Sequence, residues 1–325
     1  MQLPNRRLFN QTLVALASSA LSVPSRAQAY PAKPVTIVVP FAPGGPTDTQ
    51  TRLLASQVQG ILGVRVLTEN KSGAGGNVGA AYAARAPADG YTLLMGTNGT
   101  LAANVALFEK LAYNPATDFE PVVMFTHMPN MLVVHPSVPA KNVPELVGYL
   151  KAHPDLPYGS GGIGTSSHFA GELFKKMTGV RMDHVSYRGD GQSLPDLIAG
   201  NIKICFCSVL AGMKWLPNGE LRALGVTSAS RVPAVKQLPT IAEQGLPGYD
   251  VTSWYAIVAP AGTPQDVVRT LNGAFVKAMA NAEFKSKMEA MGAILVPSTP
   301  EQLKEFVAKE MPRWAKLVQD AGVKL

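Results

Sequence analysis

The chain has 325 residues, of which 46% are hydrophobic and 16% are charged, with a formal net charge of +7 at pH 7. This length and composition allow a large buried core and favour two domains or lobes over a disordered chain. The positive charge is mild and spread along the chain, so it does not support a nucleic-acid-binding protein.

Residues 1–29 have the features of a secretory signal peptide. A positive start, MQLPNRRLFN, precedes a short apolar run, QTLVALASSALSV, and an A-x-A cleavage pattern ends just before Tyr30. The apolar run is too short to be interpreted as a membrane span. The pair Arg6-Arg7 also resembles a twin-arginine signal, so both export routes stay open. Cleavage removes three arginines and no acid, which lowers the formal charge from +7 to +4, and the mature chain is expected in the periplasm.

Strand-like and helix-like segments alternate along the rest of the chain. The predicted strands are VTIVVPF, RVLTE, YTLLMG, MLVVH, PYGS, HVSY, KICFCS, LRALGVT and YAIVAP. The predicted helices are Thr47–Leu62, Val143–Ala152, Thr165–Met177, Gln192–Ala199, Pro264–Met291 and Pro300–Ala321. Most of the strands are short, apolar and rich in β-branched residues, which is typical of strands buried on both faces. The sequence therefore predicts an α/β fold with mostly parallel sheets.

Hydroxyl side chains stand where several of these helices begin. Thr47 and Gln50 have the spacing of a capping box, and Thr263 and Thr299 precede the two long helical patterns near the carboxyl terminus. We expect all three threonines to cap the helices that follow them.

The sequence offers no evident metal centre. Its two cysteines, Cys205 and Cys207, would lie on the same face of a strand, at a separation that suits a disulfide poorly. The five histidines show no metal-ligand spacing. Two buried free thiols are the favoured interpretation, and no metal or cofactor is expected.

Four loops rich in glycine and hydroxyl residues follow predicted strands. They are PFAPGGPTDTQTR from Pro40, SGAGGN from Ser72, GTNGT from Gly96 and GSGGIGTSS from Gly159. In an open α/β sheet such loops meet at the carboxyl ends of the strands, where ligands bind. The first N–H groups of the following helices are unpaired and carry partial positive charge. Loops that converge there could hold an anion without an arginine.

The same loops do not favour a nucleotide site. None contains the lysine that a phosphate-binding P-loop requires. Gly159, Gly161 and Gly164 match a G-x-G-x-x-G pattern, but the next strand ends in Tyr187-Arg188 rather than in an acid that could bind a ribose.

Hydrolase chemistry is also disfavoured. Tyr158 stands where a G-x-S-x-G motif around Ser160 would need its first glycine. His168 could pair with Ser160, but no acid is placed to orient it, and Asp48 is expected to serve the first turn of its own helix. His168 is interpreted as a pocket wall or a surface group, and no catalytic residue or enzyme activity is expected.

The motifs together resemble one family. YPAKPVTIVVPFAPGGPTDTQTRLLA, NKSGAGGNVGAAYAARAPADGYTLLMGT, YGSGGIGTSSHFAGELFKKMTGV, LRALGVTS and LPTIAEQGLPGYDVTSWYAIVAPAGTP resemble the Bug receptors, also called the TctC family. These are periplasmic solute receptors of tripartite tricarboxylate transporters. The resemblance covers essentially the whole mature chain.

This resemblance implies a fold, a ligand class and partners. The fold would be a two-lobed Venus flytrap in which each lobe is an α/β sandwich. The first lobe would hold residues 30–126 and 252–325, and the second residues 127–251, with the two crossovers as the hinge. The ligand would be a small carboxylate, such as a dicarboxylate, a tricarboxylate or an aromatic acid, held by loop amides, hydroxyls and ordered waters. The protein is expected to be a monomer that serves the membrane components of such a transporter. The alternative is a sensor that feeds a membrane kinase. The genes next to this one would distinguish transport from sensing.

The resemblance also implies a set of ligand-binding residues. In the first lobe they are Phe41, Ala42, Pro43, Gly44, Thr47, Asp48, Gly76, Asn77, Thr97 and Asn98. In the second lobe they are Ser160, Gly164, Thr165, Ser166, His168, Tyr187 and Cys207.

Two positions depart from the family pattern. Many members have Phe-Asp where this chain has Phe206-Cys207, and Tyr-Lys-Gly where it has Tyr187-Arg188-Gly189. Loss of an acid would make the cleft more electropositive, which favours a ligand that is only anionic or aromatic. The alternative is that Cys207 merely fills space in the core.

Overall fold

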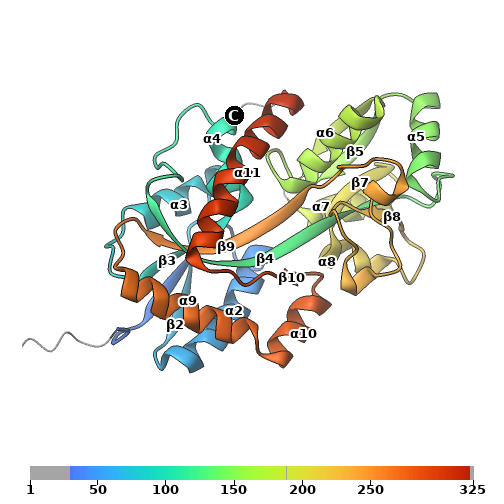
Figure 1. Cartoon of the computed structure of the whole chain (residues 1–325). Helices are drawn as coiled ribbons and strands as arrows, with labels where there is room; N and C mark the ends of the chain where they lie inside the picture. Colours follow the sequence, from blue (N-terminus) through green and yellow to red (C-terminus); the bar gives the residue numbers. More distant parts are fainter. Residues whose placement is uncertain (1–29, 188, 323–325) are drawn as a thin grey trace, which may run out of the picture. The chain divides into compact units, whose positions relative to one another are not determined.

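Strands and helices alternate along the chain, and the α/β class predicted from the sequence is confirmed. The structure, a computed structural model, describes residues 30–187 and 189–322. The predicted signal peptide at residues 1–29 and Arg188 lie outside the described residues. From Lys33 onward the chain forms one compact unit (Figure 1). None of the described helices is long and apolar enough to cross a membrane.

The elements fall into three successive groups. The first contains β1 (Val35–Val39), α2 (Pro46–Leu62), β2 (Val66–Asn70), α3 (Asn77–Ala84), β3 (Thr92–Thr97), the π-helical turn η2 (Gly99–Ala103) and α4 (Asn104–Leu107). The second contains β4 (Phe119–Val134), α5 (Val143–Ala152), β5 (Leu156–Ser160), α6 (Ser166–Thr178), β6 (Met182–Ser186), α7 (Asp190–Ile198), β7 (Ile204–Ser208), α8 (Val209–Gly212) and β8 (Arg222–Val226). The third contains β9 (Thr252–Pro260), α9 (Gln265–Met279), α10 (Ala282–Ala290), β10 (Ile294–Leu295) and α11 (Pro300–Ala321). Short 3-10 turns are η1 (Ala74–Gly76), η3 (Met213–Trp215), η4 (Pro233–Val235) and η5 (Ala242–Gln244).

The strands form one mixed sheet in the order β2-β1-β3-β9-β4-β7-β5-β6. Pairing is parallel within β2-β1-β3 and within β7-β5-β6. It is antiparallel wherever β4 or β9 takes part. The expected parallel arrangement therefore holds in the two outer parts of the sheet, and the antiparallel pairs join them.

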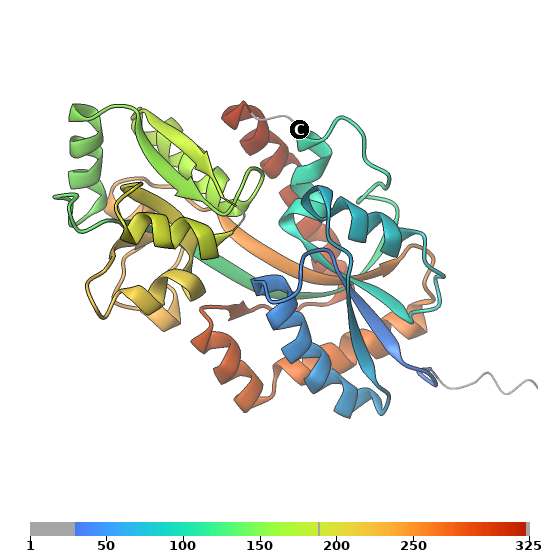
Figure 2. The ribbon, with the colours of Figure 1, turned by 180° about the vertical axis from the view of Figure 1, so that it is seen from behind.

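The long strand β4 links the two parts. Its first section, Phe119–Pro129, pairs with β9, and its second section, Asn130–Val134, pairs with β7 and β8. Both views show β4 and β9 running side by side through the middle of the described chain (Figures 1 and 2). Two register shifts, near Pro121 and near Met124, interrupt the β4–β9 ladder. Because a proline has no N–H to donate, such interruptions are expected near Pro121.

The beginnings of the helices follow the predictions only in part. Thr299 forms the expected capping box with Gln302 at the start of α11. Two other predictions are wrong. The N-cap of α2 is Gly45 rather than Thr47, and the N-cap of α9 is Pro264, since the Thr263 hydroxyl instead donates to the carbonyl of Pro260.

Other differences concern the extent of elements. The single pattern predicted over Pro264–Met291 is two helices, because Asn281 caps a new helix by accepting a hydrogen bond from the N–H of Phe284. The sequence analysis expected helices after the loops at Ser72 and Gly96 but gave no bounds for α3 or α4, and it missed the first section of β4. In that section the alternation is broken by Pro121 and by a buried apolar run, so it lacks the period-two pattern of a half-exposed strand.

Buried aromatic residues anchor α11 to the sheet. The indole N–H groups of Trp254 on β9 and Trp314 on α11 both donate to Oε2 of Glu310, at 2.8 and 2.7 Å. Arg313 donates to the other oxygen of Glu310 at 2.8 Å. Because Glu310 is only 5% exposed, these bonds satisfy a charge that would otherwise be costly to bury. The last helix is thereby fixed against the strand that leads back from the second part.

Close packing of α6 on β5 gives a stability prediction. A Cβ added at Gly171 on α6 would overlap the ring of Tyr158 on β5, whereas a Cβ at Gly148 on α5 meets open space. We expect Gly171→Ala to lower the free energy of unfolding by about 1–3 kcal/mol through overpacking. The matched Gly148→Ala should raise it by about 0.5–1 kcal/mol, since alanine is the better helix former. Denaturant unfolding of both variants measures the difference, and equal effects would contradict the packing described here.

Candidate functional site

Two adjoining cavities lie where the two parts of the sheet meet. The inner cavity has a volume of about 240 Å³, and the adjoining cavity has a volume of about 500 Å³. Both are bounded by Thr165, Ser166, Ser253 and Tyr255, so we treat them as one cleft. The cleft brings together loops from both parts of the sheet with residues of β9.

The loop before α2 forms one wall of the cleft. Phe41 and Thr47 line the inner cavity, and Gly44, Gly45 and Pro46 line the adjoining cavity. The backbone of Gly44 has φ of +80°, a left-handed conformation that costs little free energy only for glycine. This turn leads the chain into α2. The first N–H groups of α2 are therefore close to the cleft, as the sequence predicts. Ala42 and Pro43 are exposed and line neither cavity.

Asp48 holds this loop from behind. Its carboxylate accepts hydrogen bonds from the N–H of Gly44, from Nε of Arg52 and from Nδ2 of Asn70, each at 2.9 Å. Burial alone would raise the pKa of Asp48, but the bonds from Arg52, Gly44 and Asn70 together lower it, so the group is ionised. Asp48 is 3% exposed and lines neither cavity. Asp48 therefore fixes the loop, which does not favour the expected direct contact with ligand, and that contact stays a prediction.

The loop before α6 forms the facing wall. Thr165 caps α6 by accepting from the N–H of His168 and donates to the carbonyl of Gly162. Ile163, Gly164, Thr165 and Ser166 all line the inner cavity. The predicted residues Gly164, Thr165 and Ser166 therefore reach the cleft.

Ser160 and His168 lie behind that loop rather than in the cleft. Oγ of Ser160 is 2.7 Å from Nε2 of His184, and Nδ1 of His168 accepts from the N–H of Gly164 at 3.3 Å. The two imidazole rings stack with their centres 4.1 Å apart. Ser160 is fully buried and His168 is 3% exposed. Their polar atoms hold the loop, so the arrangement does not favour the expected ligand contact, which stays a prediction.

The end of β3 contributes further polar groups to the inner cavity. Thr97 and Asn98 line it as predicted. Gly76 and Asn77 do not. A Cβ on Gly76 would press on Thr100, and Oδ1 of Asn77 accepts from Nδ2 of Asn104 at 2.6 Å. Asn104, which the sequence analysis missed, is the residue that reaches the inner cavity.

Tyr187 and Cys207 also fall outside the cleft. The hydroxyl of Tyr187 donates to Asp196 at 2.7 Å. Cys207 is a buried free thiol in an apolar cluster with Met131 and Cys205. Strand alternation explains this, since Cys205 and Cys207 share the inner face of β7. Neither position favours the expected ligand contact, which stays a prediction, and the alternative that Cys207 fills core space matches its position.

Several residues of the cleft were missed. Asn130 on β4 donates to Oγ of Ser166 at 2.9 Å, and Oγ of Ser166 lies 2.6 Å from Oγ of Ser253 on β9. Burial raises the pKa of Tyr255, although hydrogen bonding by Thr47 and Ser253 opposes the shift. The segment YDVTSWY contains Ser253 and Tyr255 at a strand spacing of two, a signal that could have placed both on one face.

The cleft contains an acidic residue, although Cys207 lies outside the cleft. Asp190, the first residue of α7, lines the adjoining cavity together with Ser208 and Lys214. The expected loss of negative charge from the cleft is therefore corrected. Among the described residues that line the two cavities, Lys214 is the only lysine or arginine.

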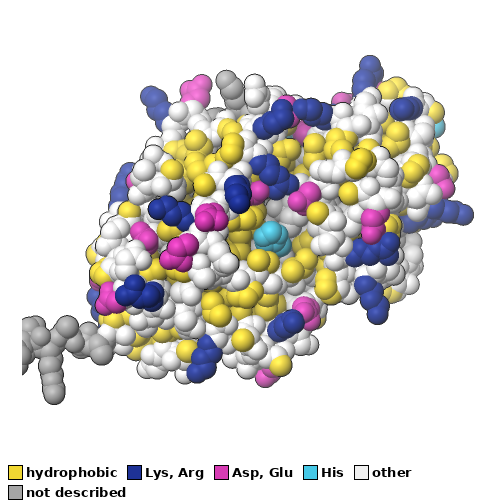
Figure 3. All heavy atoms as spheres, viewed as in Figure 1, with side chains coloured by type: hydrophobic (Ala, Val, Ile, Leu, Met, Phe, Trp, Pro, Cys, Tyr) yellow, Lys and Arg dark blue, Asp and Glu magenta, His cyan; other side chains and the backbone are white. Residues whose placement is uncertain are grey.

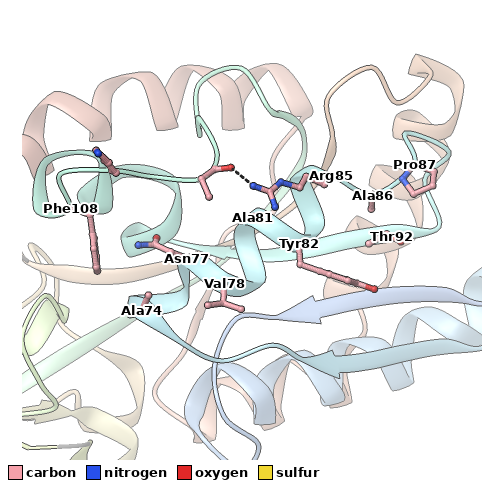
Figure 4. A pocket seen from close by; sticks show the side chains of 12 residues that line it. Ala74, Asn77, Val78, Ala81, Tyr82, Arg85, Ala86, Pro87, Thr92 and Phe108 are labelled. Carbon is pink, nitrogen blue, oxygen red and sulfur yellow. Dashed lines mark hydrogen bonds between the residues drawn. The ribbon is translucent and has the colours of Figure 1, made fainter.

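A larger cavity lies outside the cleft, against α3. This outer cavity has a volume of about 750 Å³ and is bounded by Val78, Tyr82, Arg85 and Phe108, among others (Figure 4). Arg85 is turned to the carbonyl of Ala112, to which it donates at 3.3 Å. Most of the wall is apolar, and it lacks the converging loop amides of the cleft. We therefore take the cleft as the candidate site.

The charges on the one face that Figure 3 shows give no competing signal. On the face shown in Figure 3, basic and acidic side chains are interspersed, and no wide patch of one sign is visible. A long anionic polymer would need such a patch.

The stacked histidines behind the α6 loop should make stability depend on pH. Burial lowers the pKa of His184 to about 4, with a further lowering by His168, and burial also lowers the pKa of His168. In the unfolded chain these groups take up protons below about pH 6.5. The unfolded state then binds more protons, so stability is full above about pH 6.5 and falls as the pH drops toward 4.

We expect His184→Gln, which keeps a polar group beside Ser160, to remove part of this decline. The measurement is the melting temperature of wild type and variant at intervals between pH 7 and pH 4. Parallel curves for the two proteins would show that His184 does not cause the decline.

Comparisons with known proteins give a consistent result. Residues 50–323 match the family model described as the tripartite tricarboxylate transporter family receptor, TctC. The protein BugT of Bordetella pertussis is 33% identical over 321 residues, which cover 98% of each chain. A Pseudomonas sp. (strain P51) protein from the tcbD-tcbE intergenic region is 35% identical over 315 residues, 96% of this chain and 93% of that protein.

Solved structures agree. A protein of R. palustris solved with adipate has a TM-score of 0.83 at 38% identity and covers 91% of this chain and 99% of its own. MatC of Rhodopseudomonas palustris, with bound malate, has a TM-score of 0.78 at 35% identity and covers 89% of this chain and all of its own. The periplasmic binding protein BugD has a TM-score of 0.79 at 35% identity, over 91% of this chain and 99% of its own. The expected two-lobed periplasmic-binding-protein fold is thus confirmed, and the chain belongs to the TctC family of solute-binding receptors, to which the Bug proteins are related.

Proposed function

We propose that this receptor captures a small carboxylate in the cleft and delivers it, in the periplasm, to the membrane components of a tripartite tricarboxylate transporter. The observation that carries the proposal is the convergence of three helix amino termini on one cleft. The residues that begin α2, α6 and α7 all line the adjoining cavity. The unpaired N–H groups there form a site for an anion.

The kind of donor supports a carboxylate over a more highly charged anion. The inner cavity is bounded by hydroxyls, amides and backbone, and none of its described lining residues is a lysine or an arginine. Neutral donors compensate one delocalised charge more readily than the double charge of a phosphate. The size of the inner cavity, about 240 Å³, suits a small acid.

The apolar part of the wall supports a ligand with a hydrocarbon body. Phe41, Leu107 and Phe108 line the inner cavity beside the polar groups. A dicarboxylate or an aromatic acid would bury its carbon skeleton there while its carboxylate meets the loops. The neighbours solved with adipate and malate hold ligands of this class.

The proposed hinge lies where the chain crosses between the two parts of the sheet. We propose lobe 1 at residues 30–126 and 252–325 and lobe 2 at residues 127–251. On β4 the pairing changes from β9 to β7 and β8 between Pro129 and Asn130, close to the first boundary. Rotation about β4 and β9 would open and close the cleft, because residues from both lobes bound it.

The position of Tyr255 gives a direct test. Tyr255 lies at the junction of the two cavities and is 9% exposed. If its hydroxyl bonds the carboxylate, Tyr255→Phe should weaken binding by roughly ten- to hundredfold, since a hydrogen bond to a charged group contributes about 1.5–3 kcal/mol. Calorimetric titration with a carboxylate that binds the wild type measures the change.

Tyr82→Phe is the matched control, because Tyr82 lines the outer cavity and is 47% exposed. It should leave the affinity unchanged. If Tyr82→Phe weakened binding and Tyr255→Phe did not, the ligand would sit in the outer cavity and the proposed site would be wrong.

A further inference from the structure

The carboxylate of Asp190 is a feature of the cleft that carboxylate capture does not explain. Asp190 begins α7 and lines the adjoining cavity between Gly189 and Gly191. A negative group here would repel a second carboxylate of the ligand. The hydrogen bonds to its carboxylate show which of its two oxygens can accept a further hydrogen bond.

One oxygen of Asp190 is fully engaged by Ser208. Oδ2 accepts from the N–H of Ser208 at 3.0 Å and from its hydroxyl at 2.5 Å. The hydroxyl oxygen of Ser208 accepts in turn from the N–H of Ala211 at 3.3 Å. Because the single proton of that hydroxyl points at Oδ2, this oxygen of Asp190 is an acceptor.

The other oxygen, Oδ1, lies on the side of Gly161, and both residues line the adjoining cavity. No described residue is seen to donate to Oδ1 of Asp190. Gly161, which also lines the adjoining cavity, lies across from it, and even an added Cβ on Gly161 would stay 3.7 Å from Oδ1. The glycine leaves room for an atom of a ligand at this oxygen. Oδ1 can therefore accept a hydrogen bond from a molecule in the cleft.

The surroundings of Asp190 act on its charge in opposite directions. Its position in the first turn of α7 is stabilised by the positive end of the helix. Burial raises the pKa of Asp190, and the two bonds from Ser208 act against that rise. Among the described residues that line the adjoining cavity, Lys214 is the other charged one, and it is exposed.

We infer that Asp190 is a specificity-determining residue that selects acids carrying a hydrogen-bond donor, an ammonium or a hydroxyl group, over plain carboxylates of the same length. In this arrangement the ligand carboxylate meets the amino termini of α2 and α6, and its donor meets Oδ1 of Asp190. A plain dicarboxylate leaves Oδ1 unpaired in a partly dehydrated cleft, and its second charge is repelled. The inference rests on the proposed function and names the ligand class within it.

The experiment compares acids that share a carbon skeleton. Succinate, malate and aspartate form one set, and adipate and 2-aminoadipate form another. Calorimetric titration of the mature protein should show that malate, aspartate or 2-aminoadipate binds at least tenfold more tightly than the plain acid of its set. Comparison of the affinities for aspartate and malate then shows whether the preferred donor is an ammonium or a hydroxyl group.

In the Asp190→Asn variant, the affinities for the donor-bearing acid and for the plain acid of the same set should differ by no more than about threefold. The chief reason is that the plain acid binds the variant more tightly than it binds the wild type. Asp190→Ser, which keeps a small polar residue at the start of α7, repeats the test if the asparagine variant does not fold. Asp266→Asn is the matched control, because Asp266 is an exposed acid in the first turn of α9, and its preference should equal that of the wild type.

The outcomes separate the two proposals. If the wild type binds none of the five acids, the proposed function fails. If it binds them but does not prefer the donor-bearing acids, or if Asp190→Asn keeps the wild-type preference, Asp190 only joins α7 to Ser208 and the inference is overturned.

Discussion

The structure depends on one constraint, which is the direction of its parallel strands. In each outer part of the sheet the strands run the same way, so the helices that follow them begin at a common edge. β4 and β9 join the two parts, and loops from both edges line the cleft. The site is thus made chiefly of backbone N–H groups and hydroxyls, and it needs few charged side chains.

The loops that carry these groups are held from behind by buried polar residues. Asp48 fixes the loop before α2, and the pair His168 and His184 fixes the loop before α6. Donors held in advance lose little entropy when a ligand arrives, which improves affinity. Asp190 differs from these residues, because among the described residues only Ser208 donates to it, at Oδ2, while Oδ1 lies on the side of Gly161.

The sequence predicted the fold more completely than the site. Short β-branched strands and capped helices are local patterns, and α5 and α11 were placed with the bounds that the structure shows. The first section of β4 was missed because burial on both faces and Pro121 remove its alternation. The family was recognised from motifs spread over the whole chain, which neither composition nor a single glycine loop could have identified.

Direct contact with the cleft was harder to predict. The sequence shows that Ser160, His168 and Asp48 stand in the right loops, but not that their side chains turn inward to hold those loops. Cys207 was misplaced for a related reason, since one step along β7 separates the core from the strand end at Ser208. Asp190 was overlooked because its part in the site depends on β7 and α7 coming together in space.

The central claim is that the helix amino termini around the cleft hold the ligand carboxylate. The most direct measurement is a crystal structure of the mature protein with the carboxylate that binds it most tightly in a calorimetric screen. The account predicts the carboxylate within hydrogen-bonding distance of the loops that begin α2 and α6, near Thr47, Thr165 and Tyr255. A ligand seated in the outer cavity beside Tyr82 and Arg85 would contradict it.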